Sequence, residues 1–300
     1  MCARVLSYLL ATAAAAVDIS VTESGASGRQ WAPLPGLTWT QGTPPAGVAL
    51  SLNASDRRQG VMGFGAAFTD TSAYNAMVFM YEPVQAQFLE ALWGSTGLGL
   101  NLMRVTINSA DYSFQSFNYD NVTDDFSLVH FDHNLTYDRQ RVMPLIRAAR
   151  AVAAAWTTNE IKLFGSPWSP PGWMKRNGDM INSDVICLKD DVAEGSYQQT
   201  WANYIVAWLD GYAAAGLPMW GLTPQNEPEA RQLKFESCAY DVAHYVEWVG
   251  QFLGPAVKQR FPELQVMAYD HNKVDSVAYA AGVYNDSRAS AVVDGFAVHW

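Results

Sequence analysis

The feature that most constrains the fold is an alternation of short apolar segments with longer segments of helical periodicity, which begins at residue 61. Six segments favour strands: residues 61–64, 101–106, 161–166, 220–223, 266–270 and 295–299. Between them, apolar side chains recur every three or four residues, most clearly over residues 197–212 and 242–253. Repeated β-then-α units predict a mainly parallel sheet with right-handed crossovers. Six units in one run predict an α/β protein with a (β/α)8 TIM barrel rather than two separate domains.

The main alternative is a doubly wound nucleotide-binding sheet, and the glycine pattern disfavours it. The segment Gly63-Phe64-Gly65-Ala66-Ala67 lacks the third glycine of a phosphate-binding turn, and no clear helix start follows it. A net charge of −10 also argues against a nucleic-acid partner, which requires clustered Lys and Arg. The 11 Trp residues favour either a large aromatic core or stacking faces for sugar rings, and composition does not separate these two interpretations.

The N-terminal region predicts a secreted protein with a flanking β-region. Residues 1–16 carry one positive charge, a short apolar stretch and an Ala-rich end, which together are typical of a secretory signal peptide. Residues 17–58 are rich in Thr, Ser, Gly and Pro and favour short strands and turns, and residues 59–300 hold the predicted barrel. Four N-glycosylation sequons begin at Asn53, Asn121, Asn134 and Asn285. We therefore expect a glycoprotein of the secretory pathway, either lysosomal or extracellular.

Cysteine usage leaves one question open. With Cys2 inside the expected signal peptide, Cys187 and Cys238 remain. Two cysteines are too few for a disulfide scaffold and lack metal-ligand spacing. They either pair across two loops or remain as small buried apolar side chains.

Polar residues gather where the predicted strands end, which is where a TIM barrel places its active site. The sharpest signal is Asn226-Glu227-Pro228, directly after the fourth predicted strand. A carboxylic acid there can protonate a glycosidic oxygen. The neighbouring amide can hold the sugar 2-hydroxyl, whose hydrogen bond strengthens in the oxocarbenium-like transition state. This tripeptide predicts a glycosidase acid/base at Glu227, whereas without its context it would be an ordinary turn.

Four ordered motifs resemble one enzyme family. They are residues 63–70 (GFGAAFTD), 166–174 (SPWSPPGWM), 226–228 (NEP) and 296–300 (FAVHW). Together they resemble glucosylceramidases of glycoside hydrolase family 30. The resemblance implies a TIM barrel that carries a β-sandwich built from both chain ends. It also implies retaining hydrolysis of β-glucosyl lipids such as glucosylceramide, transient contact with a membrane surface, and a lipid-presenting activator protein as a partner.

The resemblance also assigns roles to individual positions. Glu227 resembles the acid/base, and Arg104 resembles the arginine that steadies the nucleophile. The substrate-binding positions that it implies are Asp111, Trp168, Asn226, Phe235, His299 and Trp300. Structural roles compete with these: an ion pair for Arg104, a loop cap for Asp111, and core packing for Trp168, His299 and Trp300. No metal or other cofactor is expected, because hydrolysis by two carboxylates needs none.

One element of the family pattern is missing. A retaining glycosidase needs a second carboxylate about 5–5.5 Å from the acid, and in this family it is a Glu at the end of the seventh strand. The sequence stops at Trp300, in the sixth predicted strand. We therefore expect a barrel truncated after about six strands, and an inactive chain when it is isolated. Other readings remain: a family 30 enzyme acting on xylan or β-1,6-glucan, or a non-catalytic, truncated copy that binds carbohydrate or lipid.

Overall fold

The computed structural model describes residues 21–25, 32–34 and 55–300. The chain divides into two compact units at the junction between Gly60 and Val61. In the described part of the first unit, β1 (Thr22–Glu23) and β2 (Ala32–Pro33) pair in antiparallel fashion. The expected signal peptide (residues 1–16), most of the expected β-region (residues 17–58) and the first sequon lie outside the described residues, so the sandwich stays a prediction.

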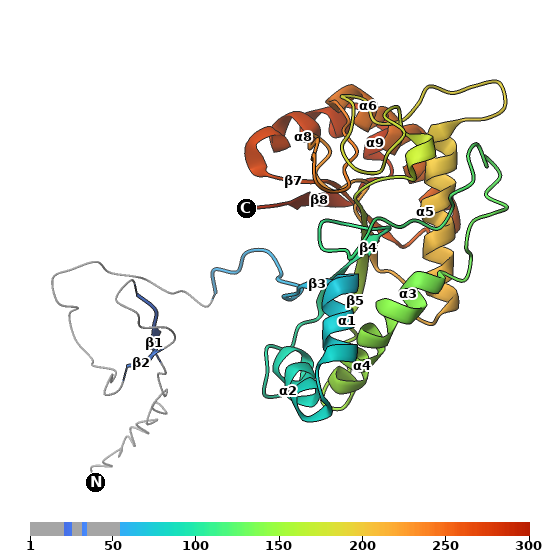
Figure 1. Ribbon diagram of the computed structural model, residues 1–300. Coiled ribbons are helices and arrows are strands. Elements are labelled where there is room, and N and C mark those ends of the chain that lie inside the picture. The colour runs from blue at the N-terminus through green and yellow to red at the C-terminus, as the bar shows by residue number, and fades with distance from the viewer. Residues whose placement is uncertain (1–20, 26–31, 35–54) are drawn as a thin grey trace, which may run out of the picture. The chain divides into compact units, whose positions relative to one another are not determined.

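The second unit confirms the predicted parallel sheet. Its described strands form a six-stranded sheet in the order β3-β4-β5-β6-β7-β8, and every neighbouring pair is parallel (Figure 1). Strand order follows chain order without reversal, as in a barrel wall rather than a doubly wound sheet. The strands are β3 (Ala67–Phe68), β4 (Leu102–Ile107), β5 (Lys162–Pro167), β6 (Gly221–Leu222), β7 (Gln265–His271) and β8 (Gly295–Val298).

The first strand lies later in the chain than predicted. Residues 61–64 were expected to form it, but the ladder with β4 lies at Ala67 and Phe68. The chain already approaches β4 at Phe64, whose carbonyl accepts the backbone N–H groups of Asn101 and Leu102. At Gly65 the two backbones are so close that an added Cβ would lie 1.4 Å from the Leu102 carbonyl oxygen. This contact explains the need for glycine at residue 65, directly after the segment predicted as a strand.

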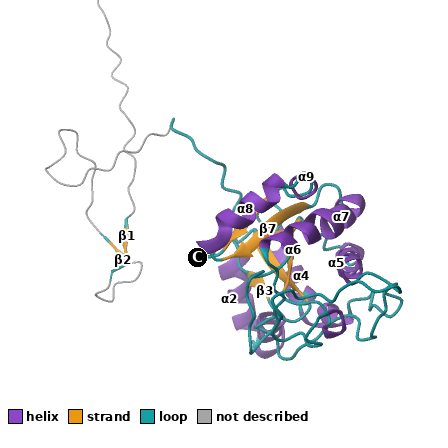
Figure 2. Ribbon diagram, turned by 90° about the horizontal axis from the view of Figure 1, so that it is seen from above, coloured by secondary structure: helices purple, strands orange, loops and turns teal. Residues whose placement is uncertain are grey.

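Helices connect and surround the strands (Figure 2). Several helices begin after a residue whose side chain accepts a backbone N–H of the first turn. Ser196 does so before the longest of the described helices, and Asp241 does so before the helical stretch that starts at residue 242. Single π-helical segments interrupt two helical stretches. The helical elements are α1 (Asp70–Tyr74), η1 (Asn75–Phe79), α2 (Glu82–Trp93), α3 (Thr136–Arg141), α4 (Met143–Ala154), η2 (Gly172–Met174), α5 (Tyr197–Ala214), α6 (Val242–Glu247), η3 (Trp248–Leu253), α7 (Gly254–Arg260), η4 (Lys273–Asp275), α8 (Ser276–Asn285) and α9 (Ser287–Ser290).

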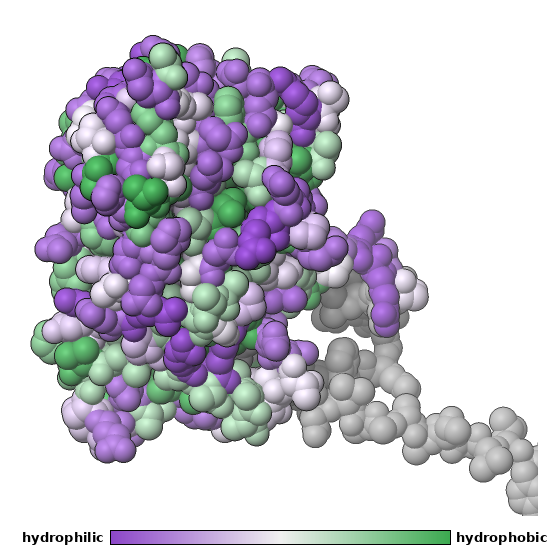
Figure 3. All heavy atoms as spheres, turned by 90° about the vertical axis from the view of Figure 1, so that its right-hand side faces the viewer, coloured by the Kyte–Doolittle hydropathy of each residue, from purple (hydrophilic) through white to green (hydrophobic). Residues whose placement is uncertain are grey.

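The aromatic stripe on α5 is core, as its spacing predicts. Trp201, Tyr204, Trp208 and Tyr212 are fully buried. The buried hydroxyls find partners: that of Tyr204 donates to Asn108 Oδ1, and it also accepts the Tyr119 N–H. The helix thereby anchors the loop that follows β4. The face of the molecule shown in Figure 3 carries mostly hydrophilic side chains, with hydrophobic ones in small separate groups. Within the described part of the chain, no helix has the length and apolar character needed to cross a bilayer.

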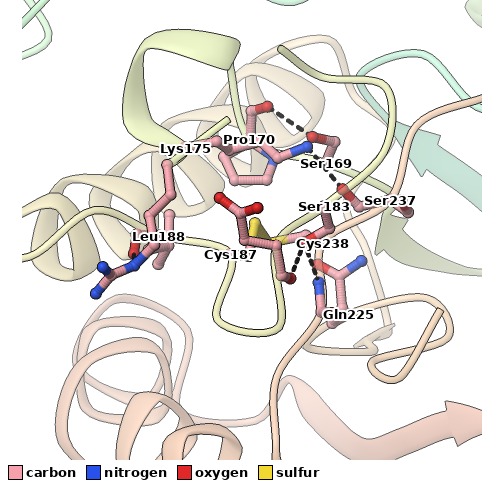
Figure 4. The surroundings of a disulfide bond; sticks show 12 residues. Ser169, Pro170, Lys175, Ser183, Cys187, Leu188, Gln225, Ser237 and Cys238 are labelled. Atoms are coloured by element: carbon pink, nitrogen blue, oxygen red, sulfur yellow. Dashed lines mark hydrogen bonds between the residues drawn. A yellow bond between two sulfur atoms is a disulfide. The ribbon is translucent and has the colours of Figure 1, made fainter. Parts of the chain in front are cut away.

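A disulfide joins two loops that flank the strand ends. Cys187, between η2 and α5, pairs with Cys238, between β6 and α6, and their Cα atoms are 5.1 Å apart (Figure 4). The buried Lys175 reinforces this connection, since its ammonium donates to backbone carbonyls in both loops, at Met180, Asn182 and Ser237. Burial lowers the pKa of Lys175 to about 7. The loop that carries Trp168 and the loop that carries Glu227 are therefore held together covalently and by hydrogen bonds.

Candidate active site

The site is built where the ends of β5, β6 and β7 meet. After β6, the Asn226 N–H donates to the carbonyl of Pro167 at 2.8 Å, and the Glu227 N–H donates to the carbonyl of Asp270 at 2.9 Å. The Asn226-Glu227 pair is therefore pinned between the two neighbouring strands. Glu227 has a φ of +48°, in the left-handed region that side chains other than Gly seldom adopt. Such local strain is typical of functional positions, because surrounding contacts must hold it in place.

The first group of side chains is a hydrogen-bonded set, the paired network. It consists of Arg104, Ser166, Thr223, Asn226 and Asp270. The Arg104 guanidinium donates to Ser166 Oγ at 2.9 Å, to Asn226 Oδ1 at 2.8 Å and to Asp270 Oδ2 at 2.6 Å. The Thr223 hydroxyl donates to the same Asp270 oxygen at 2.6 Å. Because Arg104 holds the amide oxygen of Asn226, it fixes the orientation of that side chain.

Asp270 has no free oxygen in this network, and its surroundings favour the ionised form. Burial alone would raise its pKa, but the Arg104 guanidinium and His299 outweigh burial and lower it. Its Oδ2 accepts from Arg104 and Thr223, and its Oδ1 lies 3.0 Å from His299 Nε2. A carboxylate with both oxygens occupied is suited to positioning its neighbours rather than attacking a substrate carbon.

The second group of side chains is a histidine cluster, which consists of Glu227, His271 and His299. Glu227 Oε1 lies 3.5 Å from His299 Nδ1 and 4.0 Å from His271 Nδ1. Both Nδ1 atoms are buried, and neither has a hydrogen-bond partner among the residues that the structure describes. The hydrogen bond to Asp270, followed by the contact with Glu227, raises the pKa of His299 to about 9. His299 in turn lowers the pKa of Glu227, and burial lowers that of His271.

Two predicted sugar-binding residues lie beside these groups. Trp168 is buried, and the Arg104 guanidinium lies 4.4 Å from its ring centroid. Asp111 is exposed in the loop after β4, and its pKa is raised, mainly by desolvation and further by the charge of Glu227. The start of that loop is fixed by Asn108, whose amide donates to the Ser169 carbonyl. The loop also bonds to the buried Asp70, which accepts from Ser113.

The two remaining predicted positions are Trp300 and Phe235. Trp300 stacks at a tilt on His299, with ring centroids 5.5 Å apart, and its side chain is 86% exposed. Phe235 is half-buried, and its carbonyl accepts the Asn182 N–H. Within the described part of the chain, Phe235 makes no hydrogen bond, ion pair or ring contact with either group of site residues. Their roles in substrate binding stay predictions.

Sequence reasoning missed Asp270 and His271 as site residues. They occupy a β-bulge: Tyr269 is paired with Ala297 and His271 with Val298, so Asp270 is an extra residue in β7. Tyr269 and Asp270 both have positive φ, at +79° and +61°. The bulge allows two consecutive side chains to reach the same centre. The available signal was the polar pair Asp270-His271, which closes β7 much as Asn226-Glu227 follows β6.

The comparisons with known proteins agree with this geometry. Residues 61–300 match the model of the glycosyl hydrolase family 30 TIM-barrel domain. Putative glucosylceramidase 4 of Caenorhabditis elegans is 35% identical, over 85% of this chain and 48% of its own length. The lysosomal acid glucosylceramidase of Mus musculus is 32% identical over 85% of this chain and 48% of its length. An endo-1,6-β-D-glucanase of Neurospora crassa is 31% identical over 95% of this chain and 58% of its length.

A comparison with solved structures finds a similar fold. The structure of an endo-β-1,6-glucanase matches with a TM-score of 0.71 and 26% identity, over 83% of this chain and 54% of that one. The chain spans about half the length of the glucosylceramidases that it matches. With a domain match over residues 61–300, a parallel sheet in chain order and an Asn-Glu pair at the end of β6, the chain belongs to glycosyl hydrolase family 30.

Proposed function

We propose that the full-length protein is a retaining β-glycosidase in which Glu227 is the acid/base and glucosylceramide is the substrate. The observation that carries this proposal is the pinned Asn226-Glu227 pair, held by β5 and β7 and oriented by Arg104. In this arrangement a carboxyl group and an amide stand side by side at the carboxyl ends of barrel strands. That is the placement required for protonating a leaving oxygen while holding the sugar 2-hydroxyl.

The reaction needs a second carboxylate as nucleophile. Asp270 is unsuited to this role, because Arg104, Thr223 and His299 occupy both of its oxygens. We propose that the nucleophile is a Glu at the end of a seventh barrel strand that follows Trp300 in the full-length protein. It would attack the anomeric carbon while Glu227 protonates the leaving oxygen, and water activated by Glu227 would then release the sugar. On this proposal, residues 1–300 alone do not cleave an aryl β-glucoside.

The pKa of Glu227 must change during this cycle. In the described chain His299 lowers it, which favours the carboxylate. An ionised nucleophile nearby would raise it, since two like charges in one site disfavour ionisation. Glycosylation of the nucleophile would remove that charge, the pKa of Glu227 would fall again, and the residue would become the base. The histidine cluster thus biases Glu227 toward the form needed in the second step.

The choice of glucosylceramide is supported by the glucosylceramidases at 35% and 32% identity. The strongest competing substrate is β-1,6-glucan, because the Neurospora crassa glucanase is 31% identical over a larger share of this chain. Xylan is a third candidate, and binding of a glucosyl ligand without turnover is a fourth outcome. The pinned pair is common to all hydrolytic candidates, so loops around the site must decide among them.

Lysosomal or extracellular delivery is part of the proposal, as is contact with a membrane surface that presents the lipid. The mouse relative is a lysosomal enzyme by name. The sequon residues Asn121, Asn134 and Asn285 are all exposed, as glycosylation requires. A lipid-presenting activator protein remains a proposed partner.

The test compares substrates with the full-length protein. Release of glucose from glucosylceramide in vesicles is measured beside hydrolysis of β-1,6-glucan and xylan, with the Glu227→Gln variant as control. We expect glucosylceramide to be cleaved fastest, and Glu227→Gln to lose about 10²–10⁴-fold or more in kcat/KM. Faster cleavage of β-1,6-glucan would overturn the proposal that glucosylceramide is the substrate. Near-normal turnover by Glu227→Gln would overturn the assigned role of Glu227.

A further inference from the structure

Three ligand atoms of the kind that transition metals prefer converge at the histidine cluster. They are a carboxylate oxygen of Glu227 and one ring nitrogen each of His271 and His299, and all three lie within 4.8 Å of one another. The residues come from three different elements: the loop after β6, the end of β7 and the residue that follows β8. Two imidazoles and a carboxylate form a donor set found in catalytic zinc sites.

The distances between the ligand atoms are near those around a zinc ion or longer. With metal–ligand bonds of about 2.0–2.1 Å at tetrahedral angles, ligand atoms stand about 3.3–3.5 Å apart. Glu227 Oε1 is 3.5 Å from His299 Nδ1 and 4.0 Å from His271 Nδ1. The two imidazole planes cross at 83°, with ring centroids 6.3 Å apart, so their edges approach the carboxylate from different sides. Side-chain rotations would have to shorten these separations to reach the tetrahedral geometry.

The opposite nitrogen of each ring faces a further carboxylate. His299 Nε2 lies 3.0 Å from Asp270 Oδ1, and His271 Nε2 lies 3.8 Å from Glu229 Oε2. Metal-binding histidines almost always donate their second N–H to such a group, which fixes the ring and increases its basicity. Both Nδ1 atoms, in contrast, are buried and unpartnered in the described structure. The hydrogen bond of Nε2 thus orients His299, whereas His271 Nε2 only faces Glu229. Both Nδ1 atoms face Glu227, and a metal that binds them displaces any proton they carry.

We propose that Glu227, His271 and His299 bind one Zn²⁺ ion reversibly, with the fourth position open to water. The mixed nitrogen and oxygen donors select Zn²⁺ or similar transition ions over Mg²⁺, which prefers oxygen ligands and octahedral geometry. The bound ion would be coordinated by the Glu227 carboxylate, which could then no longer transfer a proton to a glycosidic oxygen. Ion binding stands on the geometry alone, whereas this inhibition rests on the proposed glycosidase function.

The binding test uses the full-length protein, titrated with ZnCl₂ by isothermal titration calorimetry near neutral pH. A matched control comes from the same chain: His244 is a half-buried histidine bonded to Asp241 at 2.8 Å and is not part of the cluster. We expect one Zn²⁺ per chain, with His271→Asn weakening binding about 10–100-fold and His244→Asn leaving it unchanged. Circular dichroism checks that both variants are folded. Equal zinc affinity in the wild type and His271→Asn, or the absence of zinc binding by the wild type, overturns the site.

A second readout separates the ion site from the proposed activity. Each variant's glycosidase rate is measured with and without Zn²⁺ and compared with its own zinc-free rate. Zinc should inhibit the wild type and His244→Asn, and His271→Asn should need at least about tenfold more zinc for the same inhibition. If zinc binds through His271 but hydrolysis is unaffected, the inhibitory role is overturned. If zinc binds through His271 but no glycoside is hydrolysed, the site stands and the proposed function fails.

Discussion

The paired network and the histidine cluster adjoin each other at the same strand ends, yet they satisfy their polar atoms in opposite ways. In the network, Arg104 and Asp270 direct their charges at defined partners at 2.6–2.9 Å. In the cluster, the described structure leaves two buried ring nitrogens without partners, at 3.5 and 4.0 Å from Glu227. Fully satisfied buried networks stabilise one conformation, whereas unsatisfied groups cost stability and remain available for chemistry. Substitutions should therefore affect the network mainly through stability and the cluster mainly through activity.

The largest loss of stability is expected for Asp270→Ala in the full-length protein. The change leaves the Arg104 guanidinium without its ionic partner and removes acceptors for Thr223 and His299. Loss of one member of a buried ion pair lowers the free energy of unfolding by about 3–5 kcal/mol. Urea unfolding followed by Trp fluorescence measures it, and Asp270→Asn, which keeps the shape, should lose less. A loss under about 1 kcal/mol for Asp270→Ala would contradict the view that the paired network, unlike the histidine cluster, acts mainly through stability.

A smaller loss is expected for Arg104→Lys, which keeps the charge. Lysine has no planar fork with which to reach Ser166, Asn226 and Asp270 together, and it stacks less well on Trp168. We expect the free energy of unfolding to fall by about 1.5–3 kcal/mol, the usual value for hydrogen bonds to charged groups. Activity should fall as well, because the Asn226 amide loses its orientation. If Arg104→Lys were as stable in urea as the wild type, the positive charge alone would maintain the network, without the planar guanidinium.

A pH-dependent effect is expected where the two groups meet, at His299. Its folded-state pKa of about 9 lies above the unfolded value of about 6.5, so protonation stabilises the fold. This contribution is complete below about pH 6.5 and is lost as the pH rises through about 9. The free energy of unfolding should therefore decline over this range in the wild type and decline less in His299→Gln. Parallel pH profiles for the two proteins would contradict the assigned coupling to Asp270.

The smallest change in stability is expected for Glu227→Gln. The substitution removes the charge that faces two histidines, but it breaks no hydrogen bond of the side chain in the described structure. We expect the free energy of unfolding to fall by no more than about 1 kcal/mol, since only a charge contact is lost, although the variant is expected to lose its activity. Urea unfolding of both proteins at the same pH makes the comparison. A loss as large as that of Asp270→Ala would mean that Glu227 is a structural residue.

Patterns that depend on local periodicity were predictable from the sequence. The parallel sheet followed from alternating β and α segments, and the burial of Trp201 and Trp208 followed from helical spacing. Glu227 could be singled out as a candidate because it lies beside Asn226 directly after a strand, and its role stays a prediction. In the same way, the family relationship was visible from four short motifs and is confirmed by the domain match.

Features that depend on contacts between distant segments were not predictable. The pairing of Cys187 with Cys238 rests on two loops 51 residues apart in sequence, which the strands bring together. The position of β3 rests on the pairing of Ala67 with Arg104 of β4, which lies 37 residues later in the sequence. The partners of Arg104 come from three other strand ends, so its amide contact with Asn226 had no local signal.

The bulge in β7 has a consequence for how such a site can change over evolutionary time. In a regular strand, consecutive side chains face opposite sides, and one strand end contributes one residue to a given centre. The extra residue lets Asp270 support the paired network while His271 joins the cluster. Deletion of that residue would restore regular pairing and remove Asp270, so that the strand end would provide one polar side chain fewer. A point substitution in β7 exchanges one functional group for another. A single-codon insertion or deletion instead changes the number of functional groups that the strand end provides.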